Sequence, residues 1–137
     1  MTSPVKIVFF DLDGTLLSSD KQVSTVNIGC LNALGKKKIL RVVSTGRSLY
    51  SYNRLLGRQI LPADYLIVSN GSGILKKPEN TLLKTSQFKE NDVERIRLHL
   101  MTHGVNFMIH EKVPDNHSFK YVVGKNPHSD FQRRIQL

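Results

Sequence analysis

The amino-acid sequence predicts an α/β fold in which a parallel sheet is followed by a smaller α+β segment. Three short apolar runs suit strands, at residues 6–10, 39–43 and 65–68. Helix-like stretches at about residues 24–37 and 48–57 separate them. Strands that alternate with helices in this way favour parallel pairing through right-handed crossovers. Each run ends in small or polar residues, which is the third observation that indicates this fold class.

The apolar runs are continuous, with no polar residue at every second position. That pattern is typical of strands buried on both faces, so we expect residues 6–10 to form a buried central strand. In open α/β sheets the ligand crevice lies at the carboxyl ends of the strands. The polar clusters after the three runs, at residues 11–15, 44–47 and 69–71, should therefore meet at one edge of the sheet.

The first helix has a clear start and a clear apolar spacing. Ser24 or Thr25 is a suitable N-cap, because a hydroxyl can accept a hydrogen bond from the first free backbone amides. Apolar residues recur at helical spacing through Val26, Cys30 and Leu31. We therefore expect Cys30, the only cysteine, to be a small core residue and not a nucleophile.

The pattern changes near residue 78, and we expect two domains, at residues 1–77 and 78–137. The second part mixes short strands with one amphipathic helix that Gly104 follows. The elements expected there are a strand at 81–85, a helix at 90–103, and strands at 105–109 and 119–123.

Composition excludes several classes of protein. A single cysteine excludes a scaffold held by internal disulfides, and no apolar run approaches the ~20 residues that span a bilayer. We expect a cytoplasmic protein with no membrane partner. The formal net charge of +9 suits anionic partners such as phosphorylated metabolites. The basic residues are scattered and no recognition motif accompanies them, so we expect no specific nucleic-acid partner.

Asp11 and Asp13 are the most informative residues in the chain. Two carboxylates directly after a buried strand suit Mg²⁺, which prefers oxygen ligands and keeps several waters. A second carboxyl group can also act as a general acid and base. Spacing alone leaves turns and calcium loops open, since both use similar patterns. Gln22 stands where a calcium loop would require a glutamate, which argues against that alternative.

Three motifs in order resemble the haloacid dehalogenase (HAD) superfamily. The segment at residues 10–16, Phe-Asp-Leu-Asp-Gly-Thr-Leu, resembles its first signature. The segment at 44–47, Ser-Thr-Gly-Arg, is similar to its second, which lies at the end of the next core strand. The segment at 69–73, Ser-Asn-Gly-Ser-Gly, resembles the exit from the core in the Cof-like phosphatase branch. The resemblance implies part of a HAD-like Rossmannoid sheet followed by part of an α+β cap domain.

The resemblance also implies roles for the two carboxylates. Asp11 would attack phosphorus and become an aspartyl-phosphate. Asp13 would act first as an acid and then as a base. Mg²⁺ would be the cofactor, held by the Asp11 carboxylate and by the backbone carbonyl of Asp13. The activity would be hydrolysis of small phosphorylated metabolites such as sugar phosphates.

Five further residues would bind the phosphate or the rest of the substrate. The Thr45 hydroxyl and the Gly46 amide would hold phosphoryl oxygens, as donors aimed at developing charge do. Leu12, between the two carboxylates, is assigned to the same group. Arg47 and Asn70 would face the substrate. A surface arginine at the start of a helix is the alternative for Arg47.

Two signatures of the family have no counterpart after residue 75. These are a lysine that neutralises the phosphoryl charge and a Gly-Asp pair that completes the metal site. We therefore expect the chain to end within the cap domain and its own turnover to be weak. The alternative is an inactive protein of the same fold that binds phosphate or a partner. A sheet with an unpaired edge also predicts self-association.

Overall fold

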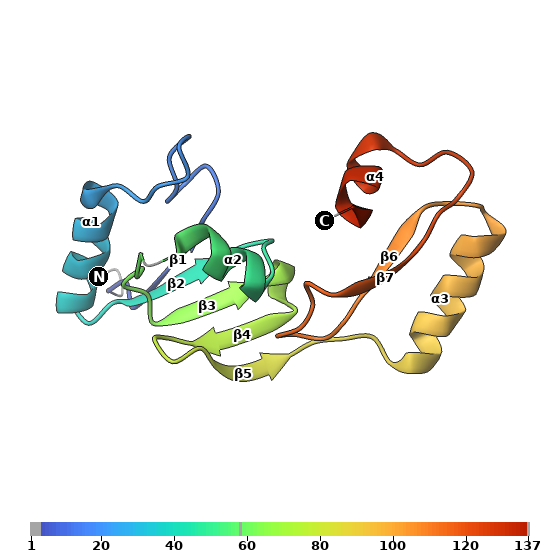
Figure 1. Ribbon diagram of the computed structural model, residues 1–137. Helices are drawn as coiled ribbons and strands as arrows, with labels where there is room; N and C mark the ends of the chain where they lie inside the picture. Colours follow the sequence, from blue (N-terminus) through green and yellow to red (C-terminus); the bar gives the residue numbers. More distant parts are fainter. Residues whose placement is uncertain (1–3, 58, 137) are drawn as a thin grey trace. The chain divides into compact units, whose positions relative to one another are not determined.

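The computed structural model describes residues 4–57 and 59–136 (Figure 1). Contacts divide the chain into two compact units, one ending at Ser86 and one beginning at Gln87. In the described part of the chain, no helix has the length and apolar character needed to cross a membrane.

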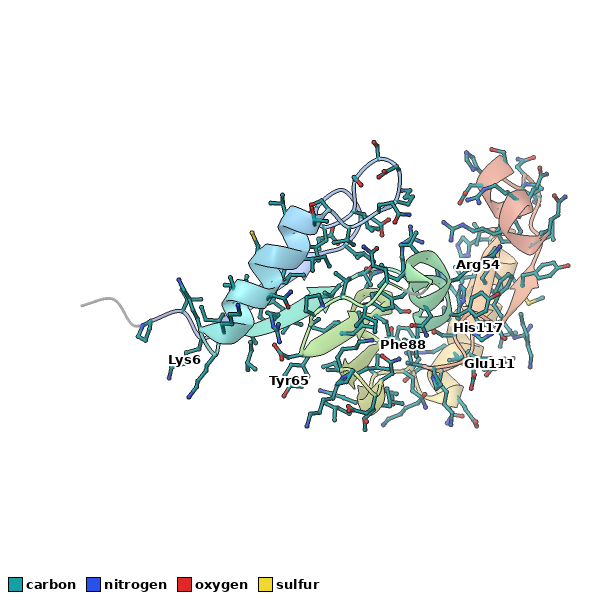
Figure 2. All side chains as sticks on the ribbon, turned by 60° about the vertical axis from the view of Figure 1, so that its left-hand side comes forward. Lys6, Arg54, Tyr65, Phe88, Glu111 and His117 are labelled. Atoms are coloured by element: carbon teal, nitrogen blue, oxygen red, sulfur yellow. The ribbon has the colours of Figure 1, made fainter. Side chains whose placement is uncertain are left out.

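The first unit is built on one five-stranded sheet with the order β1-β2-β3-β4-β5. Pairing of β1 with β2 and of β2 with β3 is parallel, which confirms the predicted α/β fold class. The last two strands are antiparallel to their neighbours. The strands are β1 (Ile7–Asp11), β2 (Leu40–Ser44), β3 (Tyr65–Val68), β4 (Gly73–Lys76) and β5 (Thr81–Thr85). Figure 2 shows Lys6, just before β1, and Tyr65, the first residue of β3, at the same end of the sheet.

Both helices of this unit begin at serine caps, and the cap of the first helix is one of the two residues that the sequence predicts. Ser24 accepts a hydrogen bond from the Asn27 amide ahead of α1 (Thr25–Lys36). Ser48 does the same for the Ser51 amide ahead of α2 (Leu49–Leu56). These bonds satisfy backbone donors that the first turn of a helix leaves free. α2 begins shortly after β2 ends, whereas the longer loop at residues 12–24 separates β1 from α1.

The prediction that Cys30 is a core residue is wrong. Cys30 is exposed, and Leu31 is the only buried residue of α1. The helix contacts the sheet along a narrow line, so one side of the apolar stripe read from the sequence faces solvent. Val26, also on that stripe, is exposed as well.

Within the described residues of the first unit, helices α1 and α2 cover one face of the parallel strands. Stepping from β1 to β2 to β3 in one direction through right-handed crossovers places α1 and α2 on the same face (Figure 1). On the opposite face, Ile7, Phe9 and Leu40 are 41%, 59% and 42% exposed. The expected burial on both faces is therefore wrong for β1, and β1 is an edge strand in the described sheet.

An ion pair ties the start of β2 to the approach to β3. Arg41 donates to Asp64 through Nε at 2.9 Å and Nη2 at 2.8 Å, and the Arg41 amide reaches the same carboxylate at 2.8 Å. Another guanidinium nitrogen donates to the Leu31 carbonyl of α1 at 3.2 Å. One side chain therefore fixes two strands and a helix at the amino-terminal end of the sheet.

The chain divides later than the boundary expected after residue 77. The predicted strand at 81–85 is present as β5, but it pairs with β4 in the first sheet. β4 itself was not predicted. A hydrogen bond from the Ser86 amide to the Ser72 carbonyl continues this pairing, so the compact unit extends to Ser86.

The second unit contains both helices and strands, as the sequence predicts. β6 and β7 form an antiparallel pair in which Phe107 faces Val122. A row of rings runs along it through His110, Phe119, Tyr121 and Phe131, with centroids 5.2–6.5 Å apart. The last helix was not predicted. The elements are α3 (Glu90–Thr102), β6 (Phe107–His110), β7 (Phe119–Val122) and α4 (Ser129–Ile135).

The Arg41–Asp64 pair should make stability depend on pH in the acid range. Its hydrogen bonds hold the pKa of Asp64 below the ordinary value. A depressed folded-state pKa gives stability that is present above the unfolded pKa of about 3.9 and is lost as the pH falls through the folded pKa. We expect Asp64→Asn to lower the free energy of unfolding at pH 7 by roughly 2 kcal/mol and to flatten its acid dependence, as measured by urea denaturation. Glu79→Gln, at an exposed site of the same unit, is the control. An unchanged acid dependence would contradict the assignment.

The exposed β1 edge should make the chain self-associate. Unpaired strand edges with apolar side chains favour pairing with another chain. We expect Phe9→Lys to shift the sedimentation distribution toward the monomer, because it places a charge on the exposed face at little cost to folding. Phe88→Lys, at a 71% exposed phenylalanine of the second unit, should leave the distribution unchanged. A wild-type chain that sediments as a monomer at all concentrations would refute the prediction.

Candidate active site

The register of the parallel strands brings the predicted site residues together at the carboxyl ends of the strands. Asp11, the last residue of β1, lies opposite Ser44 at the end of β2. Ser44 in turn lies opposite Ile67, and the Thr45 amide donates to the Ile67 carbonyl at 2.9 Å. The short helix η1 (Ser69–Gly71) follows β3 and contains Asn70. The three polar clusters therefore meet at the carboxyl ends of the strands, as expected.

Backbone hydrogen bonds join the polar residues after β2 (44–47) to those after β3 (69–71). The Asn70 amide donates to the Thr45 carbonyl at 3.2 Å, and the Ser69 amide donates to the Arg47 carbonyl at 2.9 Å. Ser69 and Asn70 have φ values of 51° and 55°, a region that non-glycine residues rarely adopt. Thr45 is only 4% exposed, and its hydroxyl accepts from the Arg47 amide at 3.2 Å. The bonds hold this unusual backbone, and with it the position of Asn70.

Gly46 lies directly against the Asn70 side chain. A Cβ atom at position 46 would be 3.1 Å from Asn70 Oδ1, which is closer than ordinary side-chain contacts. Glycine here allows the amide of Asn70 to approach the turn after β2. A larger residue at position 46 would require the Asn70 side chain to shift by a few tenths of an ångström.

Asp13 and Arg47 form the strongest interaction of the site. Arg47 donates to both carboxylate oxygens of Asp13, each at 2.7 Å. Lys21 Nζ lies 3.9 Å from Oδ1 of the same carboxylate. The hydrogen bonds from Arg47 are the main cause of a lowered pKa for Asp13, so the group is anionic in this arrangement. Arg47 also donates to Ser51 at 3.1 Å, so its guanidinium is held beside Asp13, and its role in binding substrate stays a prediction.

Leu12 anchors the turn that carries both carboxylates. Its side chain is completely buried, and its carbonyl accepts from the Leu16 and Leu17 amides at 3.1 and 2.9 Å. Asp11 and Asp13, on either side of it, are exposed. With its side chain in the core, Leu12 has only its main chain with which to contact a phosphate. The chain then turns at Gly14, where φ is 76°.

The donor set fits a magnesium ion that keeps much of its water. Mg²⁺ is commonly held by one or two carboxylates together with substrate phosphates. Asp11 offers an exposed carboxylate, and Asp13 offers its backbone carbonyl because Arg47 already occupies its carboxylate. Within residues 4–57 and 59–136 there is no group of three or more His, Cys, Asp or Glu side chains that could hold a metal. The metal-binding roles of Asp11 and Asp13 stay predictions.

Three residues near the site were not singled out from the sequence. Lys21 reaches Asp13 from the loop after β1, and its sequence position gives no signal of this. Ser51 and Arg54 lie four and seven residues after Arg47, which is the spacing of one helix face. Together with Arg47 and Leu55 they line an open hollow of about 420 Å³. A search for polar residues at helical spacing from Arg47 would have found two of the three.

The comparison with known protein families agrees with this geometry. Residues 8–133 match the haloacid dehalogenase-like hydrolases. The chain belongs to this family. The resemblance read from the motifs at residues 10–16, 44–47 and 69–73 is thereby confirmed. The roles that the resemblance implies for Asp11, Asp13, Leu12, Thr45, Gly46, Arg47 and Asn70 are a separate matter and stay predictions.

The chain is similar to several members of the haloacid dehalogenase family. The 5-amino-6-(5-phospho-D-ribitylamino)uracil phosphatase of Bacillus subtilis is 34% identical over 70 residues, which are 51% of this chain and 28% of that protein. A haloacid dehalogenase-like hydrolase structure from B. subtilis is 30% identical, with a TM-score of 0.62, over 76% of this chain and 36% of that one. A family phosphatase from Bacteroides thetaiotaomicron shares the fold, at 21% identity and a TM-score of 0.67, over 85% and 41%. The chain thus spans about a third of the curated relatives' length.

Removing the guanidinium should free the Asp13 carboxyl group. In Arg47→Met we expect the pKa of Asp13 to rise toward its ordinary value, because the main cause of its lowering is gone. A carboxyl-carbon NMR titration of Asp13 measures the change directly. Arg54→Met, in α2 and also beside the hollow, is the control and should leave the titration unaltered. An equal Asp13 pKa in wild type and Arg47→Met would contradict the assignment.

Proposed function

We propose that the protein is a Mg²⁺-dependent phosphatase of small phosphorylated metabolites, such as sugar phosphates, that works through an aspartyl-phosphate. The observation that carries the proposal is the meeting of Asp11 and the Asp13–Arg47 pair with Thr45 and Asn70 at one sheet edge. Family membership supports the reaction class.

Asp11 is the nucleophile in the proposed reaction. One of its carboxylate oxygens forms a bond to phosphorus while the bond from phosphorus to the ester oxygen breaks. The departing oxygen takes a proton from Asp13. Water then attacks the aspartyl-phosphate, gives a proton back to Asp13 and releases inorganic phosphate. At the end of the reaction Asp11 is again a carboxylate, and Asp13 again carries a proton.

Arg47 controls whether Asp13 can serve as the acid. An acid must carry a proton, and the bidentate contact with Arg47 keeps Asp13 anionic. Phosphoryl oxygens bind a guanidinium in the same bidentate way. The substrate phosphate would therefore draw Arg47 away from Asp13 and allow it to take up a proton. Arg47 binds the substrate in this scheme, and Asp13 becomes competent only when substrate is present.

Donors around Asp11 would stabilise the transferring phosphoryl group. Thr45 is held by the backbone of its neighbours, so little reorganisation is needed as charge develops on the phosphoryl oxygens. Gly46 lets the Asn70 amide lie close beside it. When bound, Mg²⁺ would supply positive charge that allows an anionic carboxylate to approach an anionic phosphate. The Asp11 carboxylate and the Asp13 carbonyl would hold it.

Small phosphorylated metabolites are the substrate class that the surroundings suit. The hollow beside Arg47 carries a second arginine, Arg54, and the hydroxyl of Ser51. These groups can bind phosphate oxygens and sugar hydroxyls. The B. subtilis relative is named for a phosphorylated ribityl compound, which supports this class for the present chain.

Phosphate binding without turnover is the second candidate. The observation that supports this second candidate is that the described residues bring no third acidic side chain to the two aspartates. Losing one good electrostatic contributor costs ~10²–10³ in rate. We therefore expect the activity of the 137-residue chain to be very weak compared with that of longer family members.

Phosphate release from a panel of sugar phosphates tests the proposal. We expect slow release with Mg²⁺, none with a chelator, and none in Asp11→Asn, which keeps the shape of the side chain but removes the nucleophile. Asp20→Asn, an exposed change in the same loop, should keep the wild-type rate.

The outcomes separate the two candidate functions. Equal release by Asp11→Asn and wild type would refute Asp11 as the nucleophile. Saturable binding of a sugar phosphate with no release above the chelator background would favour the second candidate. Full-strength turnover would refute the expectation that two carboxylates are too few.

A further inference from the structure

The carboxyl end of α3 (Figure 1) carries two histidines on one side of the helix. His99 lies in the last turn, and His103 is the C-cap, where φ and ψ of −89° and −3° are still close to helical values. Residues four apart are neighbours on a helix surface, and the centres of the two rings are accordingly 4.4 Å apart. Both residues are exposed. Neither belongs to the candidate active site.

A hydrogen bond decides which ring nitrogen of His103 carries the proton. Its Nδ1 lies 2.9 Å from the carbonyl oxygen of His99, which also accepts from the Thr102 hydroxyl at 2.7 Å. A carbonyl can only accept, so in the neutral ring the proton is on Nδ1 and Nε2 keeps its lone pair. Metal-binding histidines commonly donate their other nitrogen to a backbone carbonyl, because this bond orients the ring. His103 therefore already makes the contact that orients a metal ligand.

The position of the pair at the end of a helix favours a cation. The aligned peptide dipoles give the carboxyl end of a helix a partial negative charge, which acts within the last turn. Arg95, one turn before His99, is the cation of the preceding turn on this side. Its guanidinium donates to Asp92 at 3.1 Å, so a carboxylate offsets its charge.

One metal ion can reach both rings. Metal–nitrogen bonds to histidine are about 2.0–2.1 Å long, which puts the metal about 3.2 Å from the ring centre. Ring centres that are 4.4 Å apart are both within that reach. Imidazole nitrogen suits Cu²⁺, Ni²⁺ and Zn²⁺, whereas Mg²⁺ and Ca²⁺ prefer oxygen ligands.

We propose that His99 and His103 chelate one divalent transition-metal ion of the Cu²⁺, Ni²⁺ and Zn²⁺ class, with water in the remaining coordination positions. Two histidines four apart on a helix are also the metal-binding part of the helical zinc motif. The described residues include no group of three or more His, Cys, Asp or Glu side chains that could hold a metal. The site is therefore an open one with two protein ligands, and its ion exchanges with solution.

Titration of the 137-residue chain with Ni²⁺ tests the proposal, at a pH above 7 because ligating imidazoles have to be neutral. Excess Mg²⁺ is present throughout, since it fills oxygen sites such as the two aspartates and competes poorly for imidazole. We expect paramagnetic Ni²⁺ to broaden the ring NMR signals of His99 and His103 before those of His110, His117 and His128. Calorimetry measures the affinity. Broadening that begins at another histidine, or no binding up to about 1 mM Ni²⁺, would overturn the proposal.

Two variants and two matched controls locate the site. His99→Gln and His103→Gln should each weaken Ni²⁺ binding at least about tenfold, because the second nitrogen binds as an intramolecular ligand. His117→Gln removes an exposed imidazole elsewhere in the same unit and should keep the wild-type affinity.

The second control keeps the number of histidines and changes only their spacing. Met101→His combined with His103→Met places the two histidines two residues apart, where helical side chains do not face each other. This double variant should bind no better than His103→Gln. All the altered positions are exposed, so the variants should fold, and far-UV circular dichroism checks that they do. Wild-type affinity in either single variant, or in the double variant, would refute chelation by the pair.

Discussion

The parallel register of β1, β2 and β3 is the constraint on which the candidate site depends. Pairing Asp11 with Ser44, and Ser44 with Ile67, makes three strands end at the same level. The residues that come directly after these strand ends are far apart in the chain but lie close together in space. A shift of one residue would turn the side chains of a strand to the other face of the sheet. The Arg41–Asp64 pair at the opposite end of the same strands helps to hold this register.

Charge is balanced differently at the two ends of the sheet. At the carboxyl end, the Asp13 carboxylate is already paired with Arg47, and Lys21 lies nearby. That pair is partly exposed, so it can exchange partners at modest cost. At the amino end, Lys77 lies over the Tyr52 ring, 5.5 Å from its centre, beside a cavity whose described lining residues include no acidic one. The arrangement at the carboxyl end suits a step in which a proton moves.

Helix α2 links these two regions through its two faces. Ser51, Arg54 and Leu55 line the open hollow beside Arg47, whereas Tyr52, Asn53 and Leu56 line the cavity beside Lys77. The helix runs back along the sheet from the turn after β2 (Figure 1). Its buried residues, Tyr52 and Leu56, fix its rotation about its own axis. That rotation decides which polar side chains are presented to each region.

The sequence by itself determined the parallel strands, the capped start of the first helix and the meeting of Asp11, Thr45 and Asn70. These follow from local patterns: continuous apolar runs, serine caps and polar residues at strand ends. It did not determine that β1 is an edge strand with Phe9 exposed, or that Cys30 faces solvent, because burial depends on which other elements cover a face. Only the tertiary structure decided that Arg47 contacts Asp13 and that Lys77 lies over the Tyr52 ring, since these contacts join segments distant in the chain.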